Sequence, residues 1–224
     1  MTMQVHTRWD LLLLLSLLLL VLLYPALDHG KIRRMILGVA VFGPVILTTI
    51  RMSQIKAWVW PPVVLMVAAV IVAVLNTFLS IPTLTGIKWG LLTAFFGISV
   101  AGLFRYLRDS RSISSPHLYT AVSIYLLLGM QWFALYSAID VFLPGSFLRS
   151  ASIATDRQAE LLYFSLVTLS TVGYGDIVPL NGEVRMLAAL EGVTGVLYVA
   201  ITVALLVSSY KQQIVPSEGV EGHS

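Results

Sequence analysis

The run of residues 171–175, Thr-Val-Gly-Tyr-Gly, could present a row of backbone carbonyl oxygens to a cation. A strand that points consecutive backbone carbonyls the same way needs residues that tolerate left-handed backbone angles, and Gly173 and Gly175 supply them without a side-chain clash. Carbonyl oxygens arranged in this way can replace the water around a cation that sheds its hydration shell. Because one strand cannot surround an ion, this chemistry calls for several symmetric copies of the chain.

The segments around this run must position it. A short helix is predicted over residues 160–169, ending where the run begins. Polar residues, among them Asp156 and Glu160, stand at its start. A helix that crosses about 30 Å of hydrocarbon needs about twenty largely uncharged residues at about 1.5 Å each. Six stretches of this kind are expected to span a membrane: about 9–26, 35–50, 58–81, 87–107, 118–142 and 184–210.

The composition places the chain in a lipid bilayer. Of its 224 residues 58% are hydrophobic and 11% are charged, with a mean hydropathy of +0.89. The net charge of +3 is small and scattered, which argues against a nucleic-acid partner. There is no cysteine, the four histidines are too scattered for a local metal motif, and no hydrolase constellation or acidic cluster stands out. We therefore expect no enzyme activity and no small-molecule substrate.

From Glu160 to Pro179 the sequence reads ELLYFSLVTLSTVGYGDIVP, and Thr-Val-Gly-Tyr-Gly is the pentapeptide of potassium selectivity filters. The chain resembles a small bacterial member of the potassium channel superfamily, specifically over about residues 117–210. The resemblance implies an all-α membrane protein with six transmembrane helices, a re-entrant pore helix and a selectivity filter. It also implies a homotetrameric pore that conducts K⁺ passively among membrane lipids.

The resemblance also implies roles for individual residues. The carbonyls of Thr171, Val172, Gly173 and Tyr174 would line the K⁺ sites, with the Thr171 hydroxyl completing the innermost one. The side chains of Val172 and Tyr174 would point outward and pack against the pore helix. Asp176 would sit at the outer mouth and concentrate cations, and the carboxyl end of the pore helix would favour a cation in the cavity.

Two further residues are candidates for supporting the filter. Glu191 is an ionisable residue inside an apolar segment, which marks it as a functional hypothesis. It could brace the filter by hydrogen bonding to Thr168, Ser170 or a neighbouring backbone amide; a structural pair with Arg185 is the alternative. Tyr163 stands in the pore helix where many channels of the superfamily carry tryptophan, and it keeps a polar group there.

Gly195 is the candidate gating hinge. It follows Gly175 by twenty residues, the spacing at which the pore-lining helices of potassium channels carry their hinge glycine. A glycine in a helix interior costs roughly 1 kcal/mol relative to alanine, so it needs a reason. Gly192 competes for this role, and close packing through small residues is an equally good explanation.

Arg105, Arg108 and Arg111 are spaced three apart, as gating arginines are in voltage-sensing helices. The second and third apolar segments contain no Asp or Glu that could pair with moving arginines. We therefore expect a cytoplasmic basic cluster at a helix end and not a voltage sensor.

Three regions are predicted: a four-helix part over residues 1–115, a pore domain over 116–212 and a short cytoplasmic tail over 213–224. With the filter loop outside, six spans place both termini in the cytoplasm of a multi-pass cell-membrane protein. The loops 51–56 and 105–111 then lie inside with five arginines and lysines, as the positive-inside tendency favours. Lys31, Arg33 and Arg34 would lie outside, against that tendency.

Three alternatives remain. The leucine run 11–20 also describes a secretory signal peptide, although no small-x-small cleavage site follows it. The chain could also be a non-conducting regulatory subunit or a potassium transporter subunit. Transporter subunits usually carry several degraded filters in one chain, whereas this chain has a single intact pentapeptide.

Without a cytoplasmic ligand-sensing domain, a gate would lie in the filter, the sixth helix or the four leading helices.

Overall fold

The computed structural model describes residues 2–26, 43–44, 46–50, 60–109, 115–149 and 156–214. Most of these residues are helical, and one short strand precedes and another follows the short helix over Arg157–Leu169. In chain order the elements are α1 (Thr2–Ala26), α3 (Trp60–Leu79), α4 (Pro82–Asp109), α5 (Ser115–Phe142), β1 (Phe147–Arg149), α6 (Arg157–Leu169), β2 (Ile177–Pro179) and α7 (Gly182–Ile214).

Four helices in the described part of the chain, α3, α4, α5 and α7, are long and apolar enough to cross a membrane. They match the third to sixth of the expected segments. The first expected segment is helical in α1, where the apolar stretch Trp9–Leu23 is shorter than the other four. The second lies mostly outside the described residues, and its last five residues, 46–50, are helical.

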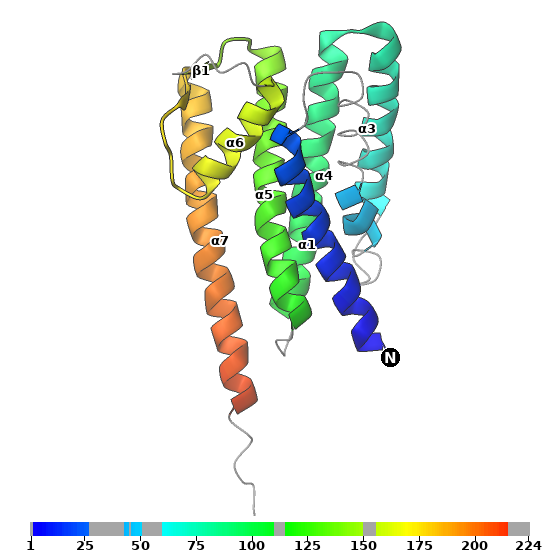
Figure 1. Ribbon diagram of the computed structural model, residues 1–224, viewed down its shortest axis with the longest axis vertical. Coiled ribbons are helices and arrows are strands. Elements are labelled where there is room, and N and C mark those ends of the chain that lie inside the picture. Colours follow the sequence, from blue (N-terminus) through cyan, green and yellow to red (C-terminus); the bar gives the residue numbers. More distant parts are fainter. Residues whose placement is uncertain are drawn as a thin grey trace, which may run out of the picture.

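The break between α3 and α4 is shorter than predicted, because α4 begins at Pro82 and not near residue 87. Proline suits the first turn of a helix, where its missing N–H would have no partner. Ser80, just before it, has a positive φ of 51° and turns the chain. The two helices therefore form a tight antiparallel pair (Figure 1).

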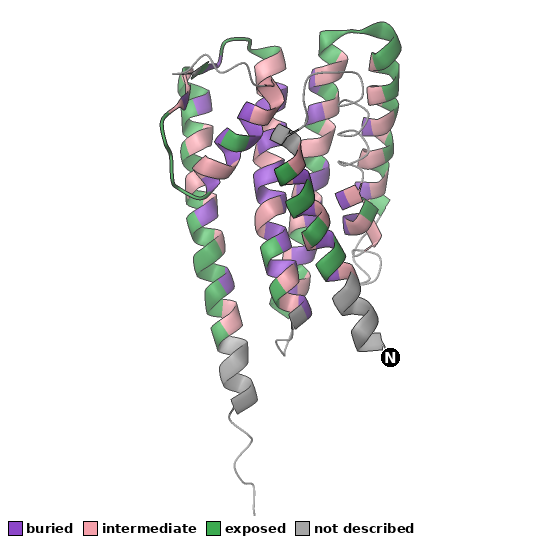
Figure 2. Cartoon of the chain, in the orientation of Figure 1, coloured by how far each residue is buried: buried purple, intermediate pink, exposed green. Residues whose placement is uncertain are grey.

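Helix α5 is the centre of the molecule (Figure 1). Helix α4 packs along it, α1 packs across it, and α6 packs on the side toward α7. Leu13, Leu17 and Leu20 of α1 lie on one helical face and are fully buried in the common core. Figure 2 shows α5 largely buried and α7 largely exposed. Helix α5 thus joins α1 and α4 to α6 and α7.

The start of α1 and the far end of α7 lie at the same end of the molecule (Figure 1). Helix α6 begins near the opposite end and runs only part of the way along its neighbours, and the chain then returns to that end at the start of α7. There β1 and β2 pair antiparallel, with Phe147 opposite Pro179 and Arg149 opposite Ile177. This small sheet ties the end of α5 to the start of α7.

Arg105 and Arg108 lie exposed in the last turns of α4. The Arg108 Nε donates a hydrogen bond of 3.0 Å to Asp109, and both side chains are exposed. An exposed pair of this kind contributes little to stability. Arg111, the loop 51–56, the group Lys31, Arg33 and Arg34, and the end of the tail lie outside the described residues.

Candidate functional site

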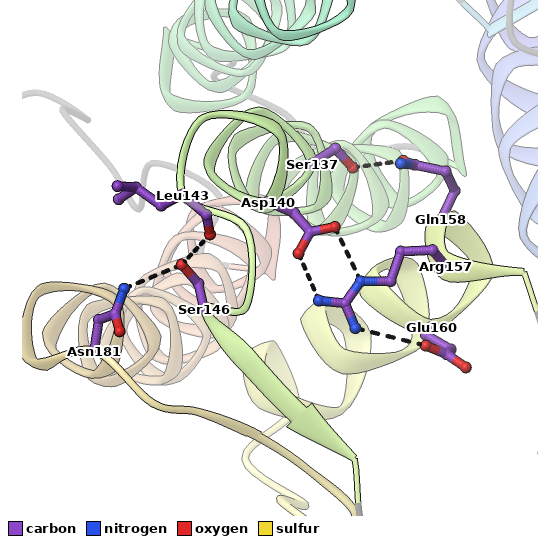
Figure 3. Close-up of polar contacts among 8 residues, drawn as sticks. All are labelled: Ser137, Asp140, Leu143, Ser146, Arg157, Gln158, Glu160 and Asn181. Atoms are coloured by element: carbon purple, nitrogen blue, oxygen red, sulfur yellow. Dashed lines mark hydrogen bonds and ion pairs between the residues drawn. The ribbon is translucent and has the colours of Figure 1, made fainter. Parts of the chain in front are cut away.

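The start of α6 is anchored to the end of α5 by an ion pair (Figure 3). The Arg157 guanidinium donates through two nitrogens to both oxygens of Asp140, with Nε 2.9 Å from Oδ2. This bond raises the pKa of Arg157 above its ordinary value, so the guanidinium stays charged. Beside it, the Ser137 hydroxyl donates to Gln158 Oε1 at 2.8 Å, and Arg157 lies 3.9 Å from the carboxylate of Glu160. A planar, two-point contact fixes orientation as well as distance.

A second set of contacts fixes the start of α7 (Figure 3). Asn181 Nδ2 donates to the Ser146 hydroxyl at 3.1 Å, and the Leu180 N–H donates to the Ser146 carbonyl at 2.8 Å. The Ser146 hydroxyl itself donates to the carbonyl of Leu143 at 2.6 Å. Both ends of the segment 170–176 are therefore held by α5 or by the turn that follows it.

The first residues after α6 fold back on its last turn. The N–H of Thr171 donates to the Thr168 carbonyl at 2.9 Å, and the N–H groups of Val172 and Gly173 donate to the Val167 carbonyl at 3.0 and 3.3 Å. These bonds satisfy carbonyls that a helix end leaves without partners. The bonds occupy the N–H groups of Thr171, Val172 and Gly173 and leave the carbonyl oxygens of these residues available to bind a ligand.

The backbone of residues 171–175 alternates in conformation. Thr171, Gly173 and Gly175 have positive φ values of 61°, 54° and 76°. Glycine adopts these angles freely, whereas a β-branched threonine does so only under strain. The sequence predicted this conformation for the two glycines and missed it at Thr171.

All five residues of this run are exposed in the single chain. Within the part of the chain that the structure describes, no hydrogen bond reaches the carbonyl oxygens of Thr171, Val172, Gly173 or Tyr174. Four neighbouring oxygen ligands on one exposed segment form a donor set that suits a hard cation. No group of three or more His, Cys, Asp or Glu side chains is found among the described residues, so these backbone oxygens are the candidate cation ligands there.

Tyr163 of α6 lies beside the far end of the run. Its ring stacks on that of Tyr174, with centroids 6.5 Å apart and an angle of 3° between the planes. Desolvation, together with the hydrogen bond that its hydroxyl donates to Asp176, raises the pKa of Tyr163 to about 12. The Asp176 carboxylate also accepts the N–H of Ile177 at 3.1 Å. Tyr163 and Asp176, both predicted as site residues, are thus in contact.

The side chains of Val172 and Tyr174 are 54% and 71% exposed. In one chain Val172 is exposed and Tyr174 stacks on Tyr163, and the packing of both side chains around an assembled filter stays a prediction.

Glu191 is fully buried between three helices. Its carboxyl accepts a hydrogen bond of 2.7 Å from the Tyr136 hydroxyl of α5 and one of 2.6 Å from the Ser165 hydroxyl of α6. The Ser165 hydroxyl also lies 2.9 Å from the carbonyl oxygen of Gly129. The expected contact with α6 is present, but the partners that the sequence predicted were wrong: neither Thr168 nor Ser170 bonds to this carboxyl, and no pair with Arg185 is found within the described residues.

Gly195 is buried against the end of α6. A Cβ at this position would overlap the carbonyl oxygen of Leu169, and backbone cannot move aside as a flexible side chain can. At Gly192 a Cβ would meet the Thr168 carbonyl at 3.7 Å, which is ordinary contact. Close approach of α7 to α6 therefore accounts for the glycine at 195, and a hinge there stays a prediction.

Sequence reasoning missed Tyr136, Ser165, Asp140 and Arg157. The signal that could have found Tyr136 and Ser165 is a hydroxyl inside an apolar helix, which must find a partner when it is buried. Its partner could not be identified, because Tyr136 and Ser165 lie 55 and 26 residues from Glu191.

Residues 122–212 match a protein-family model described as ion channel. Two pore potassium channel a of Oryza sativa subsp. japonica is 34% identical over 102 residues, which cover 46% of this chain and 25% of that protein. An A-type voltage-gated potassium channel of Homo sapiens is 34% identical over 98 residues, 42% of this chain and 15% of that protein. Two pore potassium channel b of Oryza sativa subsp. japonica is 39% identical over 72 residues, which cover 32% of this chain and 18% of that protein.

The chain spans a quarter or less of the length of these relatives. No solved structure matches it at a significant level. The matched part contains α6, α7 and most of α5, which are the helices that build the site described above. Residues 122–212 are therefore similar to an ion-channel domain and to parts of potassium channels.

Proposed function

We propose that four copies of this chain form a potassium channel, in which K⁺ moves passively down its electrochemical gradient through a filter built from residues 171–175. In each copy the carbonyls of Thr171, Val172, Gly173 and Tyr174 replace the water of the ion, and the Thr171 hydroxyl completes the innermost site. The permeant ion is the cargo, and no bond is made or broken in the protein.

The observation that carries this proposal is the backbone of the run. Three residues with positive φ alternate with the others, and four consecutive carbonyls accept no hydrogen bond from the described residues. Strain at a β-branched residue persists where the surroundings impose it, and such sites are often functional. Oxygen dipoles at this density match what a dehydrated alkali cation requires.

The requirement for several copies follows from the exposure of the same run. Non-helical backbone is tolerated at membrane depth only where protein covers it or where it lines a water-filled cavity. Residues 171–175 are exposed in one chain and α7 is largely exposed beside them (Figure 2). Symmetric copies around the run would cover the outward side and leave a central path for the ion.

The charges near the run favour a cation. Asp176 follows the run directly and would form a ring of four carboxylates at the outer mouth. Helix α6 ends at Leu169, immediately before the run, so the negative end of its dipole points toward the inner end of the path. With the mouth outside the cell, the start of α1 and the end of α7 lie on the cytoplasmic side (Figure 1).

Tyr163 and Glu191 have supporting roles in this proposal. Tyr163 holds Asp176 and stacks on Tyr174, which keeps the outer half of the filter in place. Glu191 joins α7 to α5 and α6 through two hydroxyl groups, which keeps the pore helix behind the filter. Both act by positioning the backbone that contacts the ion.

The test is the reversal potential of the purified protein in planar bilayers, first in a K⁺ gradient and then with Na⁺ replacing K⁺ on one side. A reversal potential that follows K⁺ alone supports the proposal. Gly173→Ala should abolish this selectivity, because alanine disfavours the positive φ. Gly182→Ala, at a position where a Cβ meets nothing within 4 Å, is the matched control.

Equal permeation of Na⁺ and K⁺ in the unmodified protein would contradict the filter assignment. A tetramer that passes no current under any condition would favour the regulatory subunit instead.

A further inference from the structure

The cytoplasmic half of α7 is held to its own subunit by Tyr198. The Tyr198 hydroxyl donates a hydrogen bond of 2.5 Å to the carbonyl of Ala121 in α5. Its ring lies 5.8 Å from that of Tyr125 in α5 and 6.3 Å from that of Phe104 in α4, measured between centroids. One side chain therefore links α7 to both α5 and α4.

This link lies on the other side of Gly195 from the Glu191 contacts. Glu191 precedes Gly195 by four residues and is bonded to α5 and α6, whereas Tyr198 follows it by three and is bonded to α5. At 100° per residue, Glu191 and Tyr198 project from the same side of α7. If the part of α7 after Gly195 moves relative to the part before it, the Tyr198 contacts must therefore break first.

The opposite side of α7 is apolar and uncovered. Val196, Val203 and Val207 lie within about 40° of the direction opposite to Tyr198 on an α-helix. Their side chains are 55%, 53% and 50% exposed. In the proposed tetramer the side of α7 that faces away from α5 faces the central path, so these valines would form apolar rings around it. An apolar constriction closes a pore to ions because water leaves it.

We propose that Tyr198 holds the cytoplasmic half of α7 against α5 and α4, away from the pore axis, and that Val196, Val203 and Val207 form an apolar gate that closes when this hold is lost. The inference rests on the proposed tetrameric channel. It gives the leading helices a role in gating, because a shift of α4 along α5 moves Phe104 against Tyr198.

Single-channel recording of the full chain in planar bilayers tests the hold. Tyr198→Phe removes the hydrogen bond and keeps the ring, and should lower the open probability by about fivefold or more, the equilibrium effect of one hydrogen bond in each subunit. The single-channel conductance and the reversal potential should not change. Tyr119→Phe is the matched control. This tyrosine lies on α5, and its hydroxyl makes no hydrogen bond within the described residues.

Two further variants test the other parts of the proposal. Phe104→Ala, which removes the contact from α4, should also lower the open probability. Val203→Thr keeps the side-chain shape and replaces one methyl group of the apolar ring by a hydroxyl, so it should restore opening in the Tyr198→Phe background. An open probability that is unchanged or raised in Tyr198→Phe overturns the hold, and a lack of rescue by Val203→Thr overturns the apolar gate.

A readout without current separates this inference from the proposed function. The chain has no cysteine, so Ala204→Cys accepts a single spin label in each subunit. Removal of the Tyr198 hydroxyl should shorten the distances between labels in the tetramer, and unchanged distances would contradict the proposal. If the unmodified protein does not select K⁺, the filter proposal is contradicted, whereas the distance measurement still tests the role of Tyr198.

Discussion

A carboxyl group with no exposed surface, such as that of Glu191, has lost the water that would otherwise solvate it. Burying a polar group is unfavourable unless hydrogen bonds replace that water. Tyr136 and Ser165 provide these bonds, and both hydroxyls are themselves buried or packed in the core. Removing Glu191 would leave the Tyr136 hydroxyl without this acceptor, and removing either hydroxyl would leave the carboxyl with one donor in place of two, so the network is sensitive to single substitutions.

Tyr136→Phe should destabilise the assembled protein by about 1 to 3 kcal/mol, because it leaves the Glu191 carboxyl with one donor in place of two. The measurement is thermal unfolding of the purified protein in detergent. Tyr119→Phe on the same helix should leave the melting temperature unchanged. Equal melting temperatures for Tyr136→Phe and the unmodified protein would show that the hydrogen bond contributes nothing.

Tyr163→Phe should weaken the hold on Asp176 while keeping the ring stacked on Tyr174. We expect faster loss of current during sustained opening, with the K⁺ preference retained while current flows. Because the pKa of Tyr163 is raised to about 12, the hydroxyl stays protonated and the bond is present at neutral pH; it is lost only as the pH rises through that value. In the unmodified protein, the rate at which current is lost during sustained opening should therefore not change between about pH 7 and about pH 10. A steep change in that range would exclude loss of this hydrogen bond as its cause.

At the scale of elements, the contact between α7 and the end of α6 sets how closely the two can approach. Gly195→Ala should disrupt assembly, since the added methyl group overlaps the Leu169 carbonyl. Overpacking of this kind typically costs about 1 to 3 kcal/mol and sometimes more. Size-exclusion chromatography and thermal unfolding would measure it.

Gly192→Ala is the comparison, because its Cβ makes only ordinary contact and alanine favours the helix by about 1 kcal/mol. If both variants assemble with equal stability and only Gly195→Ala alters gating, a hinge explains Gly195 better than close packing does.

The Arg157–Asp140 pair predicts a second effect at this scale. Asp140→Asn removes the charge that the guanidinium faces and should loosen the start of α6, because a partly buried two-point contact also fixes orientation. We expect lower thermal stability and faster loss of current. Asp109→Asn, which breaks an exposed pair at the end of α4, should have little effect. Similar losses in the two variants would indicate a general effect of charge.

For the whole molecule, the proposed filter would bind K⁺ between four chains and so couple ion binding to assembly. A ligand that binds only the assembled state stabilises it by RT ln(1 + [L]/Kd), about 2.7 kcal/mol at a hundredfold excess over Kd. The tetramer should therefore melt at a higher temperature in K⁺ than in Na⁺ at equal ionic strength. Gly173→Ala should remove the difference, and a protein that melts identically in both salts would not hold K⁺ in its filter.

Features that depend only on neighbouring residues could be predicted from the amino-acid sequence. Hydropathy along the chain predicted the spans α3, α4, α5 and α7, because the need for an uninterrupted apolar stretch is local. The need for left-handed angles at Gly173 and Gly175 is also local, and the structure has both.

Only the tertiary structure decided which distant groups meet. Glu191 bonds to Tyr136 and Ser165 and not to Thr168, because the crossing of α5, α6 and α7 sets which side chains share one buried space. The reason for Gly195 likewise lies in the path of another helix. Packing across long sequence separations is a property of the assembled helices, and hydropathy and spacing do not encode it.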